Sequence, residues 1–310
     1  MKHTSALATL AAFLIANQSA NAQGALTPPG APAESQKSLQ EIYDAIRFTK
    51  AEFATLVQQA VPSVPGMVTV LGGALPTESG LAGQTVATFY IGKFEVTWAD
   101  WQEVRDWAVS NGYSDLANVG EGSAGNHPVR NVSWYDVVKW CNALSERESL
   151  SPVYCVNGTV YRIGEFGIEG SSVVQIEPAA KGYRLPSEAE WEWAARGGVE
   201  SKQFNYSGSN NIDEVAWYLN NSFGADVDLD SQTRGTWSVA QKFPNELGIH
   251  DMSGNVWEWC WDFASASNSL RRSRGGAWWD GAEWFLLSSR NNSYVTERFQ
   301  STGVRLARSY

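Results

Sequence analysis

The residues that could perform acid–base, nucleophilic or metal chemistry are few, and they form none of the common catalytic motifs. Beyond its first residues the chain has two histidines, His127 and His250. The sequence has no His-Glu-x-x-His helix, no paired-cysteine zinc spacing, no Gly-x-Ser-x-Gly elbow and no phosphate-binding glycine loop. We expect a loop position for His127 and a structural hydrogen bond for His250 beside Asp251. The sequence therefore indicates no zinc protease, serine hydrolase or nucleotide-binding site.

Acidic and thiol side chains are the remaining candidates for chemistry. Glu188, Glu190 and Glu192 stand two residues apart on a predicted helix, so neighbouring pairs do not share a face. We expect solvated or capping groups there rather than an acid–base pair. One disulfide plus one buried thiol is the expected state of three cysteines outside the cytoplasm. The sequence does not choose the pair among Cys141, Cys155 and Cys260.

Charge and composition exclude several classes of protein. The formal net charge is −10, which argues against a nucleic-acid partner because phosphate binding needs a cationic surface. With 43% hydrophobic and 12% aromatic residues the chain can bury a full core, so disordered and fibrous classes are excluded. All 15 tryptophans lie between Trp98 and Trp284, and there are 28 glycines. This density predicts a rigid fold rich in irregular loops.

Residues 1–22 have the pattern of a cleavable signal peptide. A short basic start at Lys2 is followed by an apolar stretch and by an A-x-A cleavage site that ends at Ala22. The apolar stretch is too short to span a bilayer, and no later window is apolar enough. We therefore expect a protein without a transmembrane segment, exported to the periplasm or the extracellular space after cleavage near Ala22.

The segment before the globular part divides into a linker and a helix. Residues 23–37 are rich in Pro, Ala and Gly and are typical of an extended linker. Residues 38–61 are predicted to be an amphipathic helix, because apolar side chains recur at steps of three and four between Leu39 and Ala60. Residues 39–60 could form a coiled coil and a homo-oligomer. The alternative is a single helix that docks on its own domain.

Strands and helices alternate in the rest of the chain. Met67–Leu71 and Thr85–Ile91 have the composition of strands. One helix is predicted to carry Trp98 to Trp107, and a second to carry Trp134 to Leu144, with Ser133 as its N-cap and Asp136 three residues on. A third is predicted to begin at Pro186-Ser187 and to end at Gly197-Gly198.

Six segments together resemble one known family. They are FEVTWADW (94–101), HPVRNVSWYDVVKWCNALS (127–145), GYRLPSEAEWEWAARGG (182–198), PNELGIHDMSGNVWEWCWD (244–262), RGGAW (274–278) and GVRLAR (303–308). The chain resembles the formylglycine-generating enzyme family, also called the sulfatase-modifying factor family, over roughly residues 66–308. The resemblance implies one α+β domain over residues 66–310, a variant of the C-type-lectin fold. Such a domain has much irregular structure, short strands and a few helices.

The resemblance does not carry the family's oxidation chemistry with it. In the formylglycine-generating enzymes, two cysteines after the Gly-Gly motif bind copper, and their places fall near Asp280 and Phe285 here. No cysteine lies between Trp261 and Tyr310. Since copper(I) requires soft thiolate ligands, we expect neither copper nor formylglycine-generating activity. The alternative is a divergent oxidase of the same family that acts on a protein or a small molecule.

A calcium site is the metal site that the resemblance implies. Its ligands would be the side chain of Asp251, the carbonyl groups of Gly254 and Val256, and the side chain of Glu258. Calcium prefers such carboxylate and carbonyl oxygens. The alternative is that Asp251 and Glu258 cap this turn without a metal.

The C-terminal segment combines aromatic, cationic and small polar residues, as recognition surfaces do. It also resembles the lectin-fold proteins that retroelements diversify near the C-terminus. We therefore expect the chain to bind an unidentified ligand or protein partner here rather than to catalyse a reaction. The alternative is that Trp279 and Trp284 are core residues, as we expect for Trp278. The ligand-binding candidates are Trp279, Asp280, Trp284, Phe285, Tyr294, Arg298 and Phe299.

Overall fold

The computed structural model describes residues 63–165, 173–224, 234–264 and 269–310. The predicted signal peptide (1–22), linker (23–37) and amphipathic helix (38–61) lie outside the described residues, so the coiled coil through 39–60 stays a prediction. The chain divides into two units, residues 1–57 and 58–310, and the account below concerns the second. Among the residues described, no helix has both the length and the apolar character needed to cross a bilayer.

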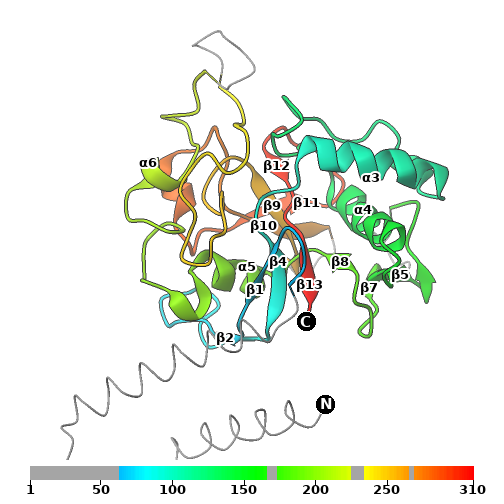
Figure 1. The fold of residues 1–310 in the computed structure, drawn as a ribbon, viewed down its shortest axis with the longest axis horizontal. Coiled ribbons are helices and arrows are strands. Elements are labelled where there is room, and N and C mark those ends of the chain that lie inside the picture. The colour runs from blue at the N-terminus through cyan, green and yellow to red at the C-terminus, as the bar shows by residue number, and fades with distance from the viewer. Residues whose placement is uncertain (1–62, 166–172, 225–233, 265–268) are drawn as a thin grey trace, which may run out of the picture. The chain divides into compact units, whose positions relative to one another are not determined.

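Short strands form four small sheets in the described part of the chain (Figure 1). The first sheet is antiparallel, in the order β1 (Met67–Val70), β4 (Phe89–Gly92), β13 (Ala307–Ser309) and β8 (Tyr183–Arg184). The second has the order β11 (Asn291–Tyr294), β10 (Leu270–Arg274), β9 (Trp257–Phe263) and β12 (Thr302–Gly303), with β12 parallel to β9. Smaller sheets pair β2 (Gly73–Ala74) with β3 (Thr85–Val86), and β5 (Tyr154–Val156) with both β6 (Thr159–Val160) and β7 (Gln175–Ile176).

The three longest helices begin where their capping residues predict. They are α3 (Trp98–Ser110), α4 (Trp134–Arg147) and α5 (Glu188–Ala195). Ser133 and Asp136 form the predicted capping box at α4, and Ser187 forms another with Glu190 at α5. Shorter helical turns are α6 (Ile212–Val215), η1 (Ser114–Leu116), η2 (Gly198–Glu200) and η3 (Ala282–Phe285).

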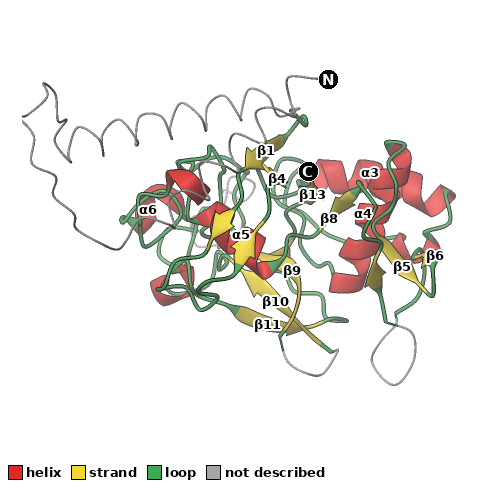
Figure 2. Cartoon of the chain, turned by 90° about the horizontal axis from the view of Figure 1, so that it is seen from below, coloured by secondary structure: helices red, strands yellow, loops and turns green. Residues whose placement is uncertain are grey.

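Two large hydrophobic clusters hold these elements together. The first lies around α3 and α4, where the rings of Trp101 and Trp140 stack with centroids 5.1 Å apart. The second lies between α5 and the sheet of β1 and β4, and it includes Trp191 and Ile91. Figure 2 shows α3 and α4 at one end of this unit and α6 at the other, with β1, β4, β9, β10 and β11 between them. The α+β fold class, with short strands and few helices, is thereby confirmed.

One predicted strand was wrong in its extent. The strand expected over Thr85–Ile91 is interrupted, because β3 and β4 pair with different partners, β2 and β1. Between them Thr88 turns aside, and its hydroxyl accepts a hydrogen bond from the N–H of Gly72. At this break the Thr88 side chain, rather than a strand partner, satisfies the backbone N–H of Gly72.

The expected disulfide is absent from the described structure, in which all three cysteines are free. Cys141 packs in the first hydrophobic cluster and Cys260 in the second, so packing separates these two thiols. Cys155 lies half-buried on β5. Burial raises the pKa of both the Cys141 and the Cys260 thiol above the ordinary value. Neither thiol is poised to react at neutral pH.

The glutamates of α5 also differ from expectation. Glu190 is a capping residue as predicted and forms a two-pronged ion pair with Arg184. Glu188 and Glu192, however, are buried and not solvated. They stand four residues apart and therefore share a face, and Arg274 on β10 meets both of them. The prediction compared only neighbours two apart and so missed this buried ionic contact.

Candidate functional site

The seven ligand-binding candidates of the C-terminal segment do not form one surface. Trp279, Trp284 and Tyr294 are exposed by 47%, 42% and 53%, whereas Phe285 is buried. Tyr294 lies at the end of β11, opposite Leu270. The structure thus divides the predicted set into one cluster around Trp279 and Trp284 and several residues with other roles.

A tight turn presents the first part of this cluster. The N–H of Asp280 donates to the carbonyl oxygen of Ala277, and the carboxylate of Asp280 accepts from the N–H of Ala277, both at 2.9 Å. Trp278 and Trp279 are therefore the two central residues of a turn that the Asp280 side chain closes. Their rings pack together with centroids 5.4 Å apart. Trp279 lies in this turn with its side chain exposed to solvent.

The 3-10 helix η3 presents the second part. Trp284 packs edge-to-face on Trp257, with centroids 6.0 Å apart, and Trp257 itself is only 5% exposed. The Trp257 side chain also lies close enough to the Asp280 carboxylate to lower the pKa of Asp280, which relates the two parts. We call Trp257, Trp278, Trp279, Asp280 and Trp284 the aromatic patch. It offers rigid aromatic surface over a buried tryptophan floor, which is how binding hot spots are built.

Phe285 is a correction to the predicted ligand-binding set, because it anchors the patch from below. Its ring is 2% exposed and packs edge-to-face on Tyr218, with centroids 5.8 Å apart. The ring also covers Gly276, where an added Cβ would lie 2.7 Å from it. Gly276 has φ +80°, so glycine is required at this position both for the backbone and for the contact.

Arg298 and Trp278 also differ from expectation. Arg298 donates two hydrogen bonds, of 2.7 and 2.9 Å, to the carboxylate of Asp136, the buried residue that also caps α4. Its guanidinium therefore ties the C-terminal segment to that helix, while the side chain stays 45% exposed. Trp278 is not a core residue, because it is half-buried and its indole N–H donates to the carbonyl of Gln300 at 3.4 Å. Phe299 is 37% exposed and adjoins Gln300.

The patch carries negative charge without a counter-ion. Burial raises the pKa of Asp280, and the neighbouring charge of Glu283 adds to this. Neither carboxylate takes part in an ion pair in the part of the chain that the structure describes. The patch is therefore an aromatic surface of acidic character.

The places of the family's copper cysteines lie in this region. The Asp280 carboxylate there closes the Trp278–Trp279 turn, and the Phe285 ring fills the space over Gly276. Within the described ranges, no group of three or more His, Cys, Asp and Glu side chains is arranged to hold a metal ion. Hydrogen bonding and packing thus occupy the positions that thiol chemistry would need.

Two of the predicted calcium ligands, Asp251 and Glu258, lie in a buried charge cluster with Glu95 and Arg305. Arg305 donates to both oxygens of Glu258 at 2.7–3.0 Å, and the indole N–H of Trp191 donates to the same carboxylate at 2.6 Å. Glu258 and Arg305 are both fully buried. Glu258 thus offers no free oxygen to an ion in this arrangement.

Asp251 differs from Glu258 in having one unused oxygen. Its Oδ2 accepts from the N–H of Ala240 at 2.7 Å, while its Oδ1 is buried without a hydrogen-bond partner. Burial, followed by the neighbouring Asp251 and Glu258 charges, raises the pKa of Glu95 well above its ordinary value, and burial also raises the pKa of Asp251. A calcium ion would have Asp251 as its starting ligand, and calcium binding stays a prediction.

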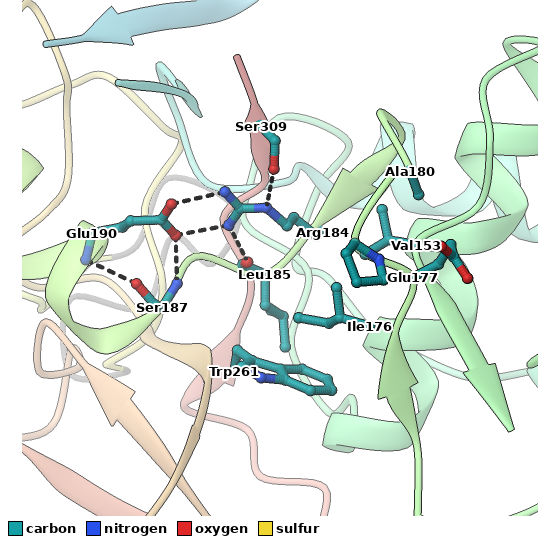
Figure 3. A pocket seen from close by; sticks show the side chains of 11 residues that line it. Val153, Ile176, Glu177, Ala180, Arg184, Leu185, Ser187, Glu190, Trp261 and Ser309 are labelled. Atoms are coloured by element: carbon teal, nitrogen blue, oxygen red, sulfur yellow. Dashed lines mark hydrogen bonds and ion pairs between the residues drawn. The ribbon is translucent and has the colours of Figure 1, made fainter. Parts of the chain in front are cut away.

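A groove of about 260 Å³ opens elsewhere, between β7, β8, α5 and β13 (Figure 3). Trp261, Leu185 and Ile176 form its apolar side, and Arg184 forms the polar side. The Arg184 guanidinium donates to Glu190, to the carbonyl of Leu185 and to the hydroxyl of Ser309, so this side is satisfied internally. The groove shares no residue with the aromatic patch, and sequence reasoning did not identify it.

Sequence reasoning also missed Trp257 as the floor of the patch. Trp257 and Glu258 are neighbours on β9, and side chains of consecutive strand residues point to opposite faces. This alternation predicts that the side chains of Trp257 and Glu258 lie on opposite faces of β9, but it does not predict which residues contact each face. A contact with Trp284, more than twenty residues away, leaves no signal in local spacing.

The comparisons with known proteins agree with the fold. The sulfatase-modifying factor enzyme 1-like domain matches residues 52–310. The chaperone protein LppX of Paenibacillus barcinonensis is 39% identical over 260 residues, which cover 78% of this chain and 89% of that protein.

Two solved structures are also similar to the chain. The crystal structure of CarF is 29% identical, with a TM-score of 0.65, and covers 79% of this chain and 98% of its own. Treponema denticola variable protein 1 is 30% identical, with a TM-score of 0.61, and covers 80% of this chain and 100% of its own. On the domain match and these likenesses, the chain belongs to the formylglycine-generating enzyme, or sulfatase-modifying factor, family.

Proposed function

We propose that this chain is an exported binding protein of the family, which holds a polypeptide partner through the aromatic patch and assists its folding. The observation that carries the proposal is the exposure of Trp279 and Trp284 on a rigid support, with Trp257 as the floor. Each exposed indole forgoes roughly 25 cal/mol per Å² of burial that a core position would provide. A partner that covers these rings recovers this free energy.

The likeness to LppX supports this class of function. LppX is named a chaperone, and the similarity covers 78% of this chain and 89% of that protein. A chaperone must present apolar surface to an unfolded chain without burying that surface in its own core. Trp279 and Trp284 meet that requirement. The predicted signal peptide would place the protein with exported clients.

The chemistry of the site favours binding over oxidation. The copper chemistry of the family needs two thiolates, and the places that correspond to them hold Asp280 and Phe285. The buried Cys141 and Cys260 are poor substitutes, since burial raises the pKa of both thiols. A divergent oxidase would need another redox group.

Suppression of aggregation tests the proposal. Reduced lysozyme that is diluted from denaturant scatters light as it aggregates, and we expect the full chain to lower this scattering at stoichiometric amounts. The double variant Trp279→Ala/Trp284→Ala should lose most of the effect, because it removes the exposed rings and leaves Trp257 in place. Tyr294→Ala is the matched control, since Tyr294 is equally exposed but lies outside the patch.

Two results would overturn the proposal. Equal suppression by the double variant and the unaltered chain would show that the patch does not hold the client. Conversion of a sulfatase-type cysteine peptide to formylglycine by copper-loaded protein, detected by mass spectrometry, would make the chain an enzyme. We expect no such mass change.

A further inference from the structure

The charges around the aromatic patch distinguish it from the other aromatic surfaces of the described structure. Arginine and lysine side chains stack on many rings elsewhere, for example on those of Trp98, Trp134 and Trp217. Even the exposed ring of Phe223 is covered by its own Arg234, at 3.8 Å from the ring centroid. In the described residues, no cation stacks on Trp257, Trp278, Trp279 or Trp284.

Carboxylates accompany these uncovered rings. Asp280 closes the turn of Trp278 and Trp279, and the Trp257 side chain lies close enough to its carboxylate to lower its pKa. Glu283 is exposed and lies next to Trp284. Both lack an ion-pair partner among the described residues, as noted above. The patch thus has the two features that attract a cation, namely free aromatic faces and unneutralised negative charge.

We infer that the aromatic patch recognises cationic segments of its polypeptide partner, in which a Lys or Arg side chain lies against the indole faces of Trp279 or Trp284. The aliphatic stem of such a side chain covers apolar ring surface while its charged head faces Asp280 and Glu283. An acidic segment would meet both carboxylates with like charge, and the chain as a whole carries −10. This inference rests on the proposed function and specifies the chemistry of its partner.

Three matched peptides separate charge from apolar contact. Each has twelve residues built on the repeat Leu-Gly-X-Ser, with Lys, Gln or Glu at X, and carries a fluorescent label for anisotropy measurements with the full chain. We expect the Lys peptide to bind about tenfold more tightly than the Gln peptide, and the Glu peptide to bind most weakly. Raising the salt from about 50 to about 500 mM should weaken the Lys peptide about fivefold and leave the Gln peptide nearly unchanged.

Two single variants locate the effect. Glu283→Gln removes an exposed charge that has no ion pair, so the fold should tolerate it, and it should weaken the Lys peptide about threefold without affecting the Gln peptide. Trp279→Leu keeps apolar surface but removes the aromatic face, and it should weaken the Lys peptide about fivefold and the Gln peptide less than twofold. Tyr294→Leu is the control for loss of an exposed ring outside the patch.

The possible outcomes separate this inference from the proposed function. Equal binding of the Lys and Glu peptides, with both weakened by Trp279→Leu, would overturn the cationic preference and leave the proposed function standing. Failure of the Lys peptide to bind, while the patch still suppresses lysozyme aggregation, would also count against the inference alone. Loss of both peptide binding and patch-dependent suppression would overturn the two together.

Discussion

The buried charge cluster and the aromatic patch lie beside each other but follow opposite rules. In the cluster, Arg305 and Glu258 are fully buried and satisfy each other. In the patch, Trp279 and Trp284 are almost half exposed, and two carboxylates have no ion-pair partner among the residues that the structure describes. Asn255 connects the two regions. Its side-chain NH2 donates to the carboxylate of Glu95, and its backbone carbonyl accepts from the backbone N–H of Trp278. The charge cluster is part of the buried interior, and the aromatic patch is exposed to solvent.

The motifs that resemble the family and the residues that carry the surface chemistry occupy different positions in the chain. The motifs GNVWEW and GVRLAR supply the two ends of the Glu258–Arg305 pair, so they report on the scaffold. The residues between them, from Trp278 to Trp284, carry the surface chemistry. A strong match in the scaffold motifs therefore predicts the fold and leaves the activity to be argued from the open region.

The largest expected effect comes from breaking the cluster. Arg305→Met removes the only cation that contacts Glu258 among the described residues, and an uncompensated buried charge costs about 3–5 kcal/mol. Denaturant unfolding measures this loss in the free energy of unfolding. Arg308→Met, three residues further on and hydrogen-bonded at the surface, should cost less than about 1 kcal/mol. A small loss in the free energy of unfolding for Arg305→Met would show that the charge cluster does not stabilise the fold.

Tryptophan variants sharpen the contrast between the two regions. Trp259 is fully buried on β9, so Trp259→Ala should cost about 3–5 kcal/mol. Trp284→Ala removes a half-exposed ring that keeps one edge contact with Trp257, and it should cost about 1 kcal/mol. The same denaturant melts compare them. Similar losses for both variants would place Trp284 in the core and contradict its role in binding.

The cluster should also make stability depend on pH. The pKa of Glu95 is raised in the folded chain, so the folded state holds a proton that the unfolded state releases near pH 4.3. This contribution is complete below the ordinary pKa of Glu and is lost as the pH rises through the raised pKa. We expect the free energy of unfolding to fall as the pH rises above the ordinary pKa of Glu and through the raised pKa of Glu95.

Two variants check the origin of this pH dependence. Glu95→Gln removes the titrating group and should flatten the stability curve over that range. Glu297→Gln changes an exposed glutamate and should leave the curve as it is. A curve that keeps its slope in Glu95→Gln would assign the effect to other groups.

The smallest expected effect is that of calcium. With Glu258 held by Arg305, Asp251 has the one carboxylate oxygen of the pair without a hydrogen-bond partner. We expect about 2 mM calcium to add no more than roughly 0.5 kcal/mol over a chelator control, as for a concentration near the Kd. Asp251→Asn should abolish this increment in thermal melts. A much larger increment would mean that Glu258 exchanges Arg305 for the ion.

The elements of the fold could be predicted because their signals are local. Ser133 with Asp136, and Ser187 before α5, are capping residues that lie within three positions of the groups they bind. The motifs then supplied the fold class. The strand over 85–91 failed because its ends pair with β2 and β1, which local composition does not reveal.

The candidate site was predicted in part because its contacts are distant in sequence. Trp279 and Trp284 were identified by residue type and position alone. The ion pair of Arg298 was not predicted, because its partner, Asp136, lies 162 positions away. Phe285 was misassigned because its burial depends on Gly276 and on Tyr218 from another segment. Adjacent aromatic residues in η3 cannot be sorted into core and surface without these partners.

The place of β13 in its sheet has a consequence for the biogenesis of the protein. This strand belongs to the C-terminal segment, yet it lies between β4 and β8 and pairs with both. A chain threaded through a pore from its N-terminus cannot complete this sheet until the segment after Arg305 has emerged. In the export that we propose, this sheet therefore closes only after the C-terminal segment has passed the pore.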